Sequence, residues 1–211
     1  MSATDWRRLP WEARYRWGGR VASAGRQLVV RATHRHCRVE FRGPVRLGPG
    51  FALDIAGPGT FVVGEAVDFR RGFVCEISGD GRVVIGDRCS FTSNVLIQCS
   101  TSIEVGDDCM FAQSVLLVDG AHRFRRHDVP VAAQGYDFRP IRIGHSVAVM
   151  AKSTVFADVG DHAMIGAHSV VSRPVPAYTL AVGAPARPVE YFGPGPAPAG
   201  VPTTAERRNT R

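Results

Sequence analysis

The segment with the residue types best suited to chemistry is VLLVDGAHRFRRHDVPVAAQGYDF, which runs from Val115 to Phe138. It places His122 and His127 among arginine and aspartate residues, between two runs of evenly spaced aliphatic residues. Imidazole exchanges a proton near neutral pH, so a histidine here could act as a general base. A long polar loop adds nothing to the packing of a regular array, so this one is predicted to be functional.

The aliphatic residues on both sides of this loop recur every six residues. This period is neither helical nor the two-residue alternation of a long strand, and it is typical of a solenoid whose short strands turn a corner every six residues. Three such faces would make a triangular coil of roughly 18 residues, with coils stacked roughly 4.8 Å apart. The phased runs are Ile85, Phe91, Ile97 and Ile103; Val105, Phe111 and Leu117; Ile143, Val149 and Val155; and Val159, Ile165 and Val171.

The sequence divides into a solenoid flanked by two different ends. Residues 1–44 are predicted to be a basic helical or capping segment, residues 45–192 the solenoid with its loop at 119–140, and residues 193–211 a disordered tail. In the first segment one apolar helical face is expected to pack on its own domain or on a partner subunit, with an anionic membrane surface as the alternative. That face comprises Trp6, Leu9, Ala13 and Trp17, and Gly18-Gly19 is expected to end it.

Composition narrows the function classes. A net charge of +7 suits an anionic partner, but the chain lacks a nucleic-acid-binding motif, so nucleic acid is not expected. Five cysteines without paired metal spacing, and no cleavable signal sequence, predict reduced thiols in a cytoplasm and no metal site. The HRHC motif at His34 to Cys37 is predicted to be a polar strand or loop, and no apolar run is long enough to span a membrane.

With this repeat frame, the sequence resembles the hexapeptide-repeat acyltransferases over roughly residues 60 to 190. The most specific part is PIRIGHSVAVMAKSTVFADVGDHAMIGAHSVVSRPVPAYTLAVGAPARPV, which is similar to the closing coils of that family and their G-x-P-A-[RK] ending. The galactoside, maltose and polysaccharide O-acetyltransferases resemble it most. The resemblance implies an all-β solenoid, a left-handed parallel β-helix.

The resemblance also implies an activity and its residues. It implies a CoA-dependent O-acyltransferase that acts on a hydroxyl of a sugar, oligosaccharide or polysaccharide by direct transfer in a ternary complex, and that assembles as a homotrimer. His122 matches the catalytic histidine, and Asp119 or Gln134 is a candidate to orient it. Asp119 could equally cap a turn. Asn94 in FTSNVL matches an asparagine that binds the acceptor hydroxyl, with a corner residue as the alternative.

For the acyl-CoA donor, the resemblance implies main-chain contacts at two alanines and side-chain contacts from three polar residues, with no metal required. Ala148 stands where relatives have a tryptophan, which suggests an acyl group larger than acetyl, such as succinyl, and Glu190 replaces a coenzyme-binding arginine of some relatives. The expected contact residues are Ala151, Ala167, Ser172, Arg173 and Arg187.

Other readings of the same residues remain. A non-catalytic solenoid used as an assembly or binding platform is the alternative function. A cysteine acyl-enzyme is a second mechanism, although Cys75, Cys89 and Cys109 fall at inward frame positions where packing explains them better. The remaining histidines of the repeats are predicted to be surface corners: His145, His162 and His168.

Overall fold

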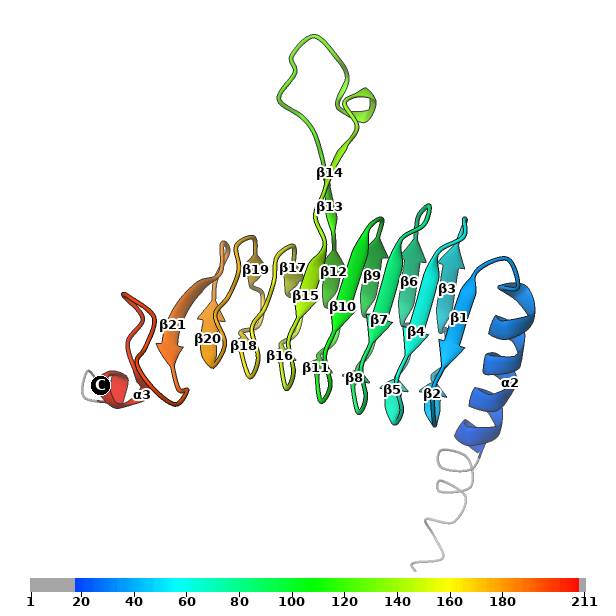
Figure 1. Cartoon of the computed structure of the whole chain (residues 1–211), viewed down its shortest axis with the longest axis horizontal. Helices are drawn as coiled ribbons and strands as arrows, with labels where there is room; N and C mark the ends of the chain where they lie inside the picture. The colour runs from blue at the N-terminus through cyan, green and yellow to red at the C-terminus, as the bar shows by residue number, and fades with distance from the viewer. Residues whose placement is uncertain (1–17, 209–211) are drawn as a thin grey trace, which may run out of the picture.

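The computed structural model describes residues 18–208, which form a parallel β-helix with three faces (Figure 1). The chain visits sheets A, B and C in turn. Sheet A contains β1 (Arg38–Phe41), β4 (Thr60–Val63), β7 (Arg82–Ile85), β10 (Ser102–Val105) and β15 (Ile141–Ile143). Sheet B contains β2 (Val45–Leu47), β5 (Val67–Phe69), β8 (Ser90–Phe91), β11 (Met110–Phe111), β16 (Ala148–Val149), β18 (Met164–Ile165), β20 (Thr179–Val182) and β21 (Arg187–Tyr191). Sheet C contains β3 (Ala52–Ile55), β6 (Val74–Ile77), β9 (Leu96–Cys99), β12 (Leu116–Val118), β17 (Thr154–Val155) and β19 (Val170–Val171).

The corners between faces explain why the sequence alternates aliphatic and small or polar residues. The chain bends sharply at residues that adopt a left-handed backbone conformation with φ between 55° and 59°. These corner residues stack from coil to coil, and after Ala66 in the first coil the amide of each donates to a carbonyl of the coil before it. They are Ala66, Arg88, Asp108, Ser146, His162 and Tyr178 between sheets A and B, and Asn94, Ser114, Lys152 and His168 between sheets B and C.

The coils differ in length, so the predicted uniform coil of roughly 18 residues is wrong. Register partners lie 22 residues apart from β4 to β7, 20 apart from β7 to β10, and 16 apart in the bridge from Ile143 to Val159. The turn from sheet C to sheet A is shorter between β9 and β10 than between β6 and β7. In the last coils, sheet A is reduced to isolated bridges. Aliphatic spacing along one face does not reveal the length of such turns.

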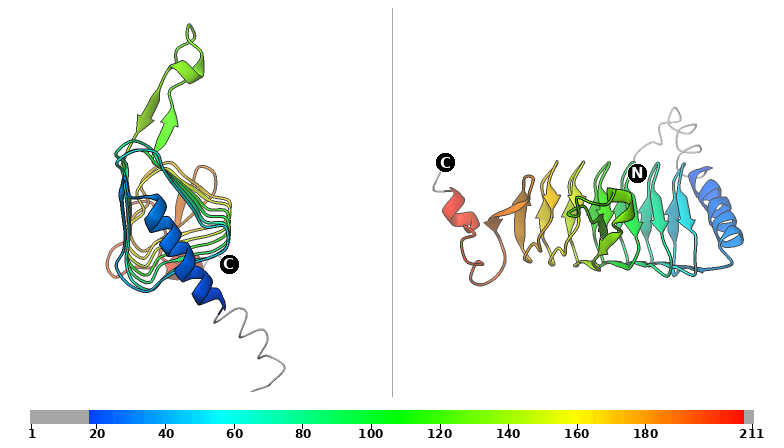
Figure 2. Two further views of the ribbon diagram at one scale, coloured as in Figure 1. Left: turned by 90° about the vertical axis from the view of Figure 1, so that its right-hand side faces the viewer. Right: turned by 90° about the horizontal axis from the view of Figure 1, so that it is seen from above.

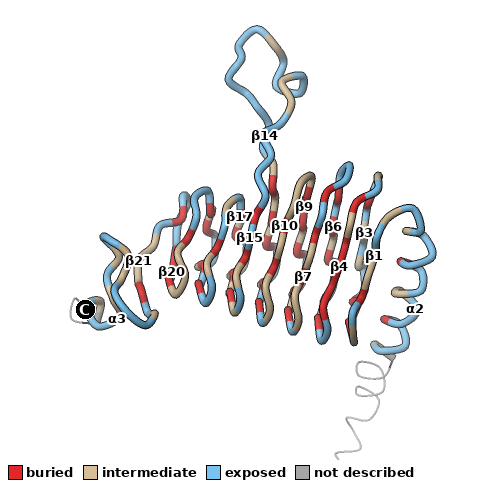
Figure 3. Tube along the Cα trace, in the orientation of Figure 1, coloured by how far each residue is buried: buried red, intermediate tan, exposed pale blue. Residues whose placement is uncertain are grey.

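Buried residues recur along every coil (Figure 3), and the side chains that fill the interior become smaller toward the shorter coils. Aromatic rings stack through the long coils, with centroids 5.0 Å apart for Phe69 and Phe91 and 4.7 Å apart for Phe91 and Phe111. Smaller side chains follow where the coils are short, because a close-packed interior must match side-chain volume to cross-section. The register series is Leu47, Phe69, Phe91, Phe111, Val149, Ile165 and Ala181.

The N-terminal end is covered by a helix, α2 (Gly18–Thr33), which lies across the first coil (Figures 1 and 2). Gly18 and Gly19 are the first residues of this helix. The predicted face at Trp6, Leu9, Ala13 and Trp17 lies outside the described residues. The first strand of the β-helix begins at Arg38, ahead of the boundary placed at residue 45.

The C-terminal end differs from the predicted disordered tail over residues 193–208. The chain folds back so that the Tyr191 amide donates to the Pro202 carbonyl, and α3 (Thr204–Arg208) follows. Thr204 Oγ1 donates to Glu190 Oε1 at 2.8 Å, which anchors this segment on β21. No helix within residues 18–208 is long and apolar enough to cross a membrane.

Candidate functional site

The polar loop leaves the β-helix after β12, at the edge between sheets C and A, and projects well beyond the body (Figures 1 and 2). Its base is an antiparallel ribbon of β13 (Gly120–His122) and β14 (Tyr136–Phe138), in which His122 is paired with Tyr136. A single 3-10 turn, Val131–Ala133, lies near the tip. The chain returns to sheet A at β15. The ribbon fixes the backbone that carries His122, because its two strands restrain one another.

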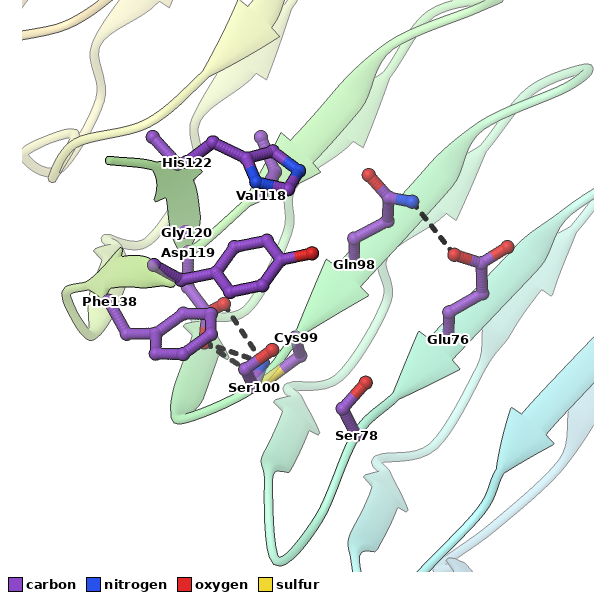
Figure 4. Close-up of a pocket in the computed structure, with 12 residues that line it drawn as sticks. Glu76, Ser78, Gln98, Cys99, Ser100, Val118, Asp119, Gly120, His122 and Phe138 are labelled. Atoms are coloured by element: carbon purple, nitrogen blue, oxygen red, sulfur yellow. Dashed lines mark hydrogen bonds between the residues drawn. The ribbon is translucent and has the colours of Figure 1, made fainter. Parts of the chain in front are cut away.

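A pocket of about 460 Å³ opens where this ribbon meets sheet C (Figure 4). The ribbon supplies His122, Tyr136 and Phe138 on one side. Outward-facing residues of sheet C, Glu76 and Gln98, supply the other side. The pocket therefore combines an imidazole, two aromatic rings, a carboxylate and an amide.

His122 is held by ring contact rather than by a hydrogen bond. Its ring centroid lies 4.1 Å from that of Tyr136, and Tyr136 is stacked on Phe138 at 5.4 Å with only 11° between the ring planes. Within residues 18–208, no protein group is hydrogen-bonded to either ring nitrogen of His122. A substrate in the pocket would therefore not have to displace a protein partner to reach this imidazole.

Asp119 is buried and faces away from His122. Its carboxylate accepts hydrogen bonds from the Ser100 amide at 2.9 Å and from the Thr101 amide and hydroxyl at 2.6 and 2.8 Å. Figure 4 shows the carboxylate directed at this turn of the preceding coil. All of these bonds tie the base of the loop to sheet C. Of the two roles considered for Asp119, the structure gives it the turn-binding one.

Gln134, the other candidate to orient His122, also bonds elsewhere. Its amide nitrogen donates to the carbonyls of Arg126 and Val129, both at 2.8 Å, and its oxygen accepts from the Arg126 amide at 3.0 Å. These bonds close the loop on itself. The predicted orienting contact from Gln134 to His122 is absent from the described chain, because the side chain is saturated by the backbone of its own loop.

Four side chains that shape the pocket were not selected from the sequence: Tyr136, Phe138, Gln98 and Glu76. Tyr136 and Phe138 are 46% and 44% exposed, unusual for aromatic rings, and both line the pocket. Gln98 Nε2 donates to Glu76 Oε2 at 2.8 Å across neighbouring strands of sheet C. Glu76 and Gln98 stand between inward frame residues and therefore face outward, but which outward residues meet the loop depends on the coil register. Tyr136 and Phe138 lie in the loop itself, where the repeat frame gives no signal.

The cysteine nearest the pocket does not have the properties of a nucleophile. Burial raises the pKa of the Cys99 thiol to about 12, and the neighbouring Asp119 charge adds to the effect. A thiol with this pKa stays protonated near neutrality, whereas the thiolate is the nucleophile. Cys75, Cys89 and Cys109 are buried in the core, as their inward frame positions predicted.

None of the predicted acceptor and donor residues lines the pocket at His122. Asn94 is a left-handed corner residue between sheets B and C, away from the edge that carries His122. Ala151 and Ala167 lie on that same B–C edge, one residue before corner positions, whereas Ser172 and Arg173 follow β19 at the C–A edge and are exposed. Arg187 is exposed at the start of β21. One chain thus does not bring Asn94 and His122 together.

The three remaining repeat histidines stand at corners, as predicted. His162 is stacked on Tyr178 with ring centroids 4.8 Å apart. His145 Nδ1 accepts the Asp107 amide at 3.1 Å, in a ladder continued by the Asp161 carboxylate. His168 has the left-handed backbone of the B–C edge. None of the three lines the pocket at His122. The residues of the described chain contain no cluster of His, Cys, Asp or Glu suited to a metal ion.

No protein-family model matches the chain. It is 34% identical over 90 residues to a probable acetyltransferase from Mycobacterium tuberculosis, which is 42% of this chain but only 30% of that protein's length.

Solved structures are similar over most of the chain. An N-acyltransferase from Bacillus cereus, AntD, solved with dTDP and 3-hydroxybutyryl-CoA, is 16% identical with a TM-score of 0.62 over 77% of this chain and 86% of its own. A hexapeptide-repeat acetyltransferase from Vibrio cholerae with acetyl-CoA is 18% identical with a TM-score of 0.54, over 81% and 78%. A galactoside acetyltransferase with coenzyme A is 18% identical with a TM-score of 0.50, over 76% and 72%. The chain therefore has the left-handed parallel β-helix fold of the hexapeptide-repeat acyltransferases.

Proposed function

We propose that this protein is an acyltransferase that moves an acyl group from coenzyme A to a hydroxyl of a sugar, oligosaccharide or polysaccharide. The observation that carries the proposal is His122, whose ring faces a pocket of about 460 Å³ and is hydrogen-bonded to no protein group of the described chain. The similar solved structures include acyltransferases bound to coenzyme A or acyl-CoA, which supports the donor.

In this mechanism His122 is the general base. A hydroxyl is a weak nucleophile, so its proton must leave as its oxygen attacks the thioester carbonyl. The imidazole takes that proton, a tetrahedral oxyanion forms, and its collapse breaks the carbon–sulfur bond. The imidazolium then returns the proton to the departing thiolate. Because Tyr136 packs on the His122 ring at 4.1 Å, the ring is held in place while both nitrogens remain available to the substrates.

The pocket supports a sugar as the acceptor. Tyr136 and Phe138 form an exposed aromatic shelf on which the apolar face of a sugar ring can stack. Gln98 and Glu76 face the shelf with hydrogen-bonding groups that suit hydroxyls. An apolar shelf opposite a few polar groups is the pattern expected for a ligand with one apolar and several polar edges.

The acyl group is proposed to be larger than acetyl. Ala148 lies in register between Met110 and Met164 on the outer face of sheet B, so the position of the absent tryptophan is bordered by thioether side chains. This apolar border favours an uncharged extension of the acyl chain over the carboxylate of succinyl. The AntD structure was solved with 3-hydroxybutyryl-CoA, and so supports a donor of this size.

The active assembly is proposed to be a homotrimer with sites shared between copies. The expected donor contacts Ala151 and Ala167 lie on the B–C edge, whereas His122 lies on the C–A edge. A site that needs both edges is most simply built from two chains. The outer face of sheet A carries ion pairs such as Arg82 to Glu104, but the outer faces of sheets B and C carry exposed or half-buried aliphatic residues that suit subunit contacts.

A donor and acceptor screen tests the proposed function. The protein is incubated with acetyl-, succinyl- and 3-hydroxybutyryl-CoA and with sugars and oligosaccharides, and products are read by mass spectrometry. We expect an O-acylated sugar, with faster transfer of 3-hydroxybutyryl than of acetyl or succinyl. Equal or faster acetyl transfer would remove the size proposal alone. Binding of sugars without release of free coenzyme A from any donor would support a binding platform and overturn the proposed activity.

A further inference from the structure

The helix α2 covers the first coil mainly with polar side chains, and Val30 is its one residue in the buried hydrophobic core. The first strands of the three sheets have unpaired backbone groups, which need partners. Ser23 Oγ accepts the Leu47 amide at 2.8 Å, and Gln27 Nε2 donates to the Val45 carbonyl at 2.7 Å. Further bonds to the same coil come from Arg26 to Leu47, His34 to Leu53 and His36 to Ile55.

The opposite side of α2 is apolar and faces outward. Val21, Leu28 and Val29 are 76%, 67% and 61% exposed, and their spacing of seven and eight residues places them on one face. Glycine and alanine residues fill the rest of that stripe. In an ordinary surface helix the apolar stripe packs on the protein. Capping the coil uses Ser23, Gln27 and the buried Val30, which lie on the other side of α2, so it does not explain this stripe.

The charge around the stripe is entirely positive. No aspartate or glutamate occurs from Gly18 to Val39, whereas five arginines do, and exposed Arg20, Arg31 and Arg35 belong to this set. The preceding residues of the sequence, 1–17, contain three tryptophans and four more arginines against two acidic residues, Asp5 and Glu12. Tryptophan is enriched at membrane interfaces, and each arginine near an anionic bilayer adds to its binding.

We propose that the outer face of α2 is a docking surface for an anionic lipid bilayer. The exposed aliphatic side chains would enter the boundary between headgroups and acyl chains, and the arginines beside them would contact acidic headgroups. A second copy of the chain fits less well, because it would bring two sets of arginines together without an acidic partner. The loop with His122 emerges from a long side of the β-helix, whereas α2 lies across its end (Figures 1 and 2), so docking leaves the pocket open.

Vesicle flotation tests this surface in the full-length chain. We expect the protein to float with vesicles of phosphatidylcholine and phosphatidylglycerol but not with phosphatidylcholine alone. The double variant Leu28→Gln/Val29→Gln should bind vesicles at least about tenfold more weakly, because it loses two aliphatic side chains that would be buried in the bilayer. Arg20→Gln/Arg35→Gln should also weaken binding, and added salt should do the same to the wild type. The control Phe192→Gln removes a 46% exposed aromatic at the other end and should bind as the wild type does.

Four results would overturn the proposal. The wild type could fail to float with anionic vesicles, or the Leu28→Gln/Val29→Gln variant could float as well as the wild type. A changed native mass of the same variant without lipid would show that the face binds a second copy. A changed trypsin sensitivity of residues 1–17 without lipid would show that the face binds that segment. Flotation needs no acyl transfer, so failure here leaves the proposed function untouched.

Discussion

At the scale of single residues, His122 and Asp119 have different environments: the imidazole is open to a substrate, whereas the carboxylate is bound to the neighbouring turn. His122 has a ring contact but no hydrogen bond within residues 18–208, whereas the Asp119 carboxylate is saturated by the turn at Ser100 and Thr101. Because this carboxylate holds the loop on sheet C, its loss should act on stability before it acts on catalysis.

We expect Asp119→Ala to lower the free energy of unfolding by about 3 kcal/mol, since it leaves the half-buried amides of Ser100 and Thr101 without an acceptor. Thermal unfolding measures the loss. Gln134→Ala, whose bonds lie in the exposed loop, is the control and should change stability much less. If Asp119→Ala abolished acyl transfer while its melting temperature stayed at the wild-type value, Asp119 would instead be acting on His122.

The buried thiol of Cys99 gives the protein a pH dependence in the alkaline range. Its pKa rises from 9.0 in the unfolded chain to about 12 in the folded one. The folded state therefore holds the proton longer, and the resulting stabilisation is complete below pH 9 and is lost as the pH rises toward 12. Urea unfolding across this range should show falling stability, and Cys99→Ala should flatten the fall. A fall of unchanged steepness in Cys99→Ala would contradict this assignment.

At the scale of elements, the aromatic stack determines the width of the early coils. Phe91 is fully buried between Phe69 and Phe111, with centroids 5.0 and 4.7 Å away. We expect Phe91→Ala to lower the free energy of unfolding by about 3–5 kcal/mol, because the neighbouring rings cannot move to fill the cavity that it leaves. Denaturant unfolding measures this cost, and Phe192→Ala, at an exposed ring, is the control. An equal loss of unfolding free energy in the two variants would show that the stacked ring stabilises the fold no more than an exposed ring does.

The sequence predicted the repeating part of these elements well. Six-residue spacing identified the inward residues, such as Ile97 and Leu117, because each strand repeats the same inward position. It also predicted a loop beginning at residue 119. It did not predict the coil lengths, which depend on turns between sheets. The helical or capping segment predicted for residues 1–44 contains α2, but the sequence did not show that this helix would cap the first coil mainly through polar side chains.

The site could be predicted only in part for the same reason. His122 follows from its place after a regular repeat. The partners of Asp119 lie about one coil earlier, at Ser100 and Thr101, and the aromatic shelf forms only when Tyr136 pairs with His122 across the ribbon. Such contacts depend on how coils stack and how the loop returns, and local sequence does not encode either.

At the scale of the whole molecule, the proposed shared site rests on the positions of His122 at the C–A edge and of the expected donor contacts Ala151 and Ala167 at the B–C edge. His122→Ala should be inactive, and so should a variant with Arg173→Glu and Arg187→Glu, which opposes the phosphates of the donor. If sites are shared, mixed assemblies refolded from the two inactive proteins should recover activity, because some sites then receive a wild-type half from each copy. Activity assays on the mixture, with each variant refolded alone as a control, measure this. No recovery in mixed assemblies of confirmed composition would place each site within one chain.

The central claim is that His122 is the base, and the most direct test compares two histidines of one loop. kcat/KM for acyl transfer is measured for His122→Asn and for His127→Asn, an exposed neighbour outside the pocket. We expect a loss of about 10²- to 10⁴-fold in His122→Asn, with an unchanged melting temperature and native mass, and almost no loss in His127→Asn. A His122→Asn enzyme as active as the His127→Asn control would contradict the account.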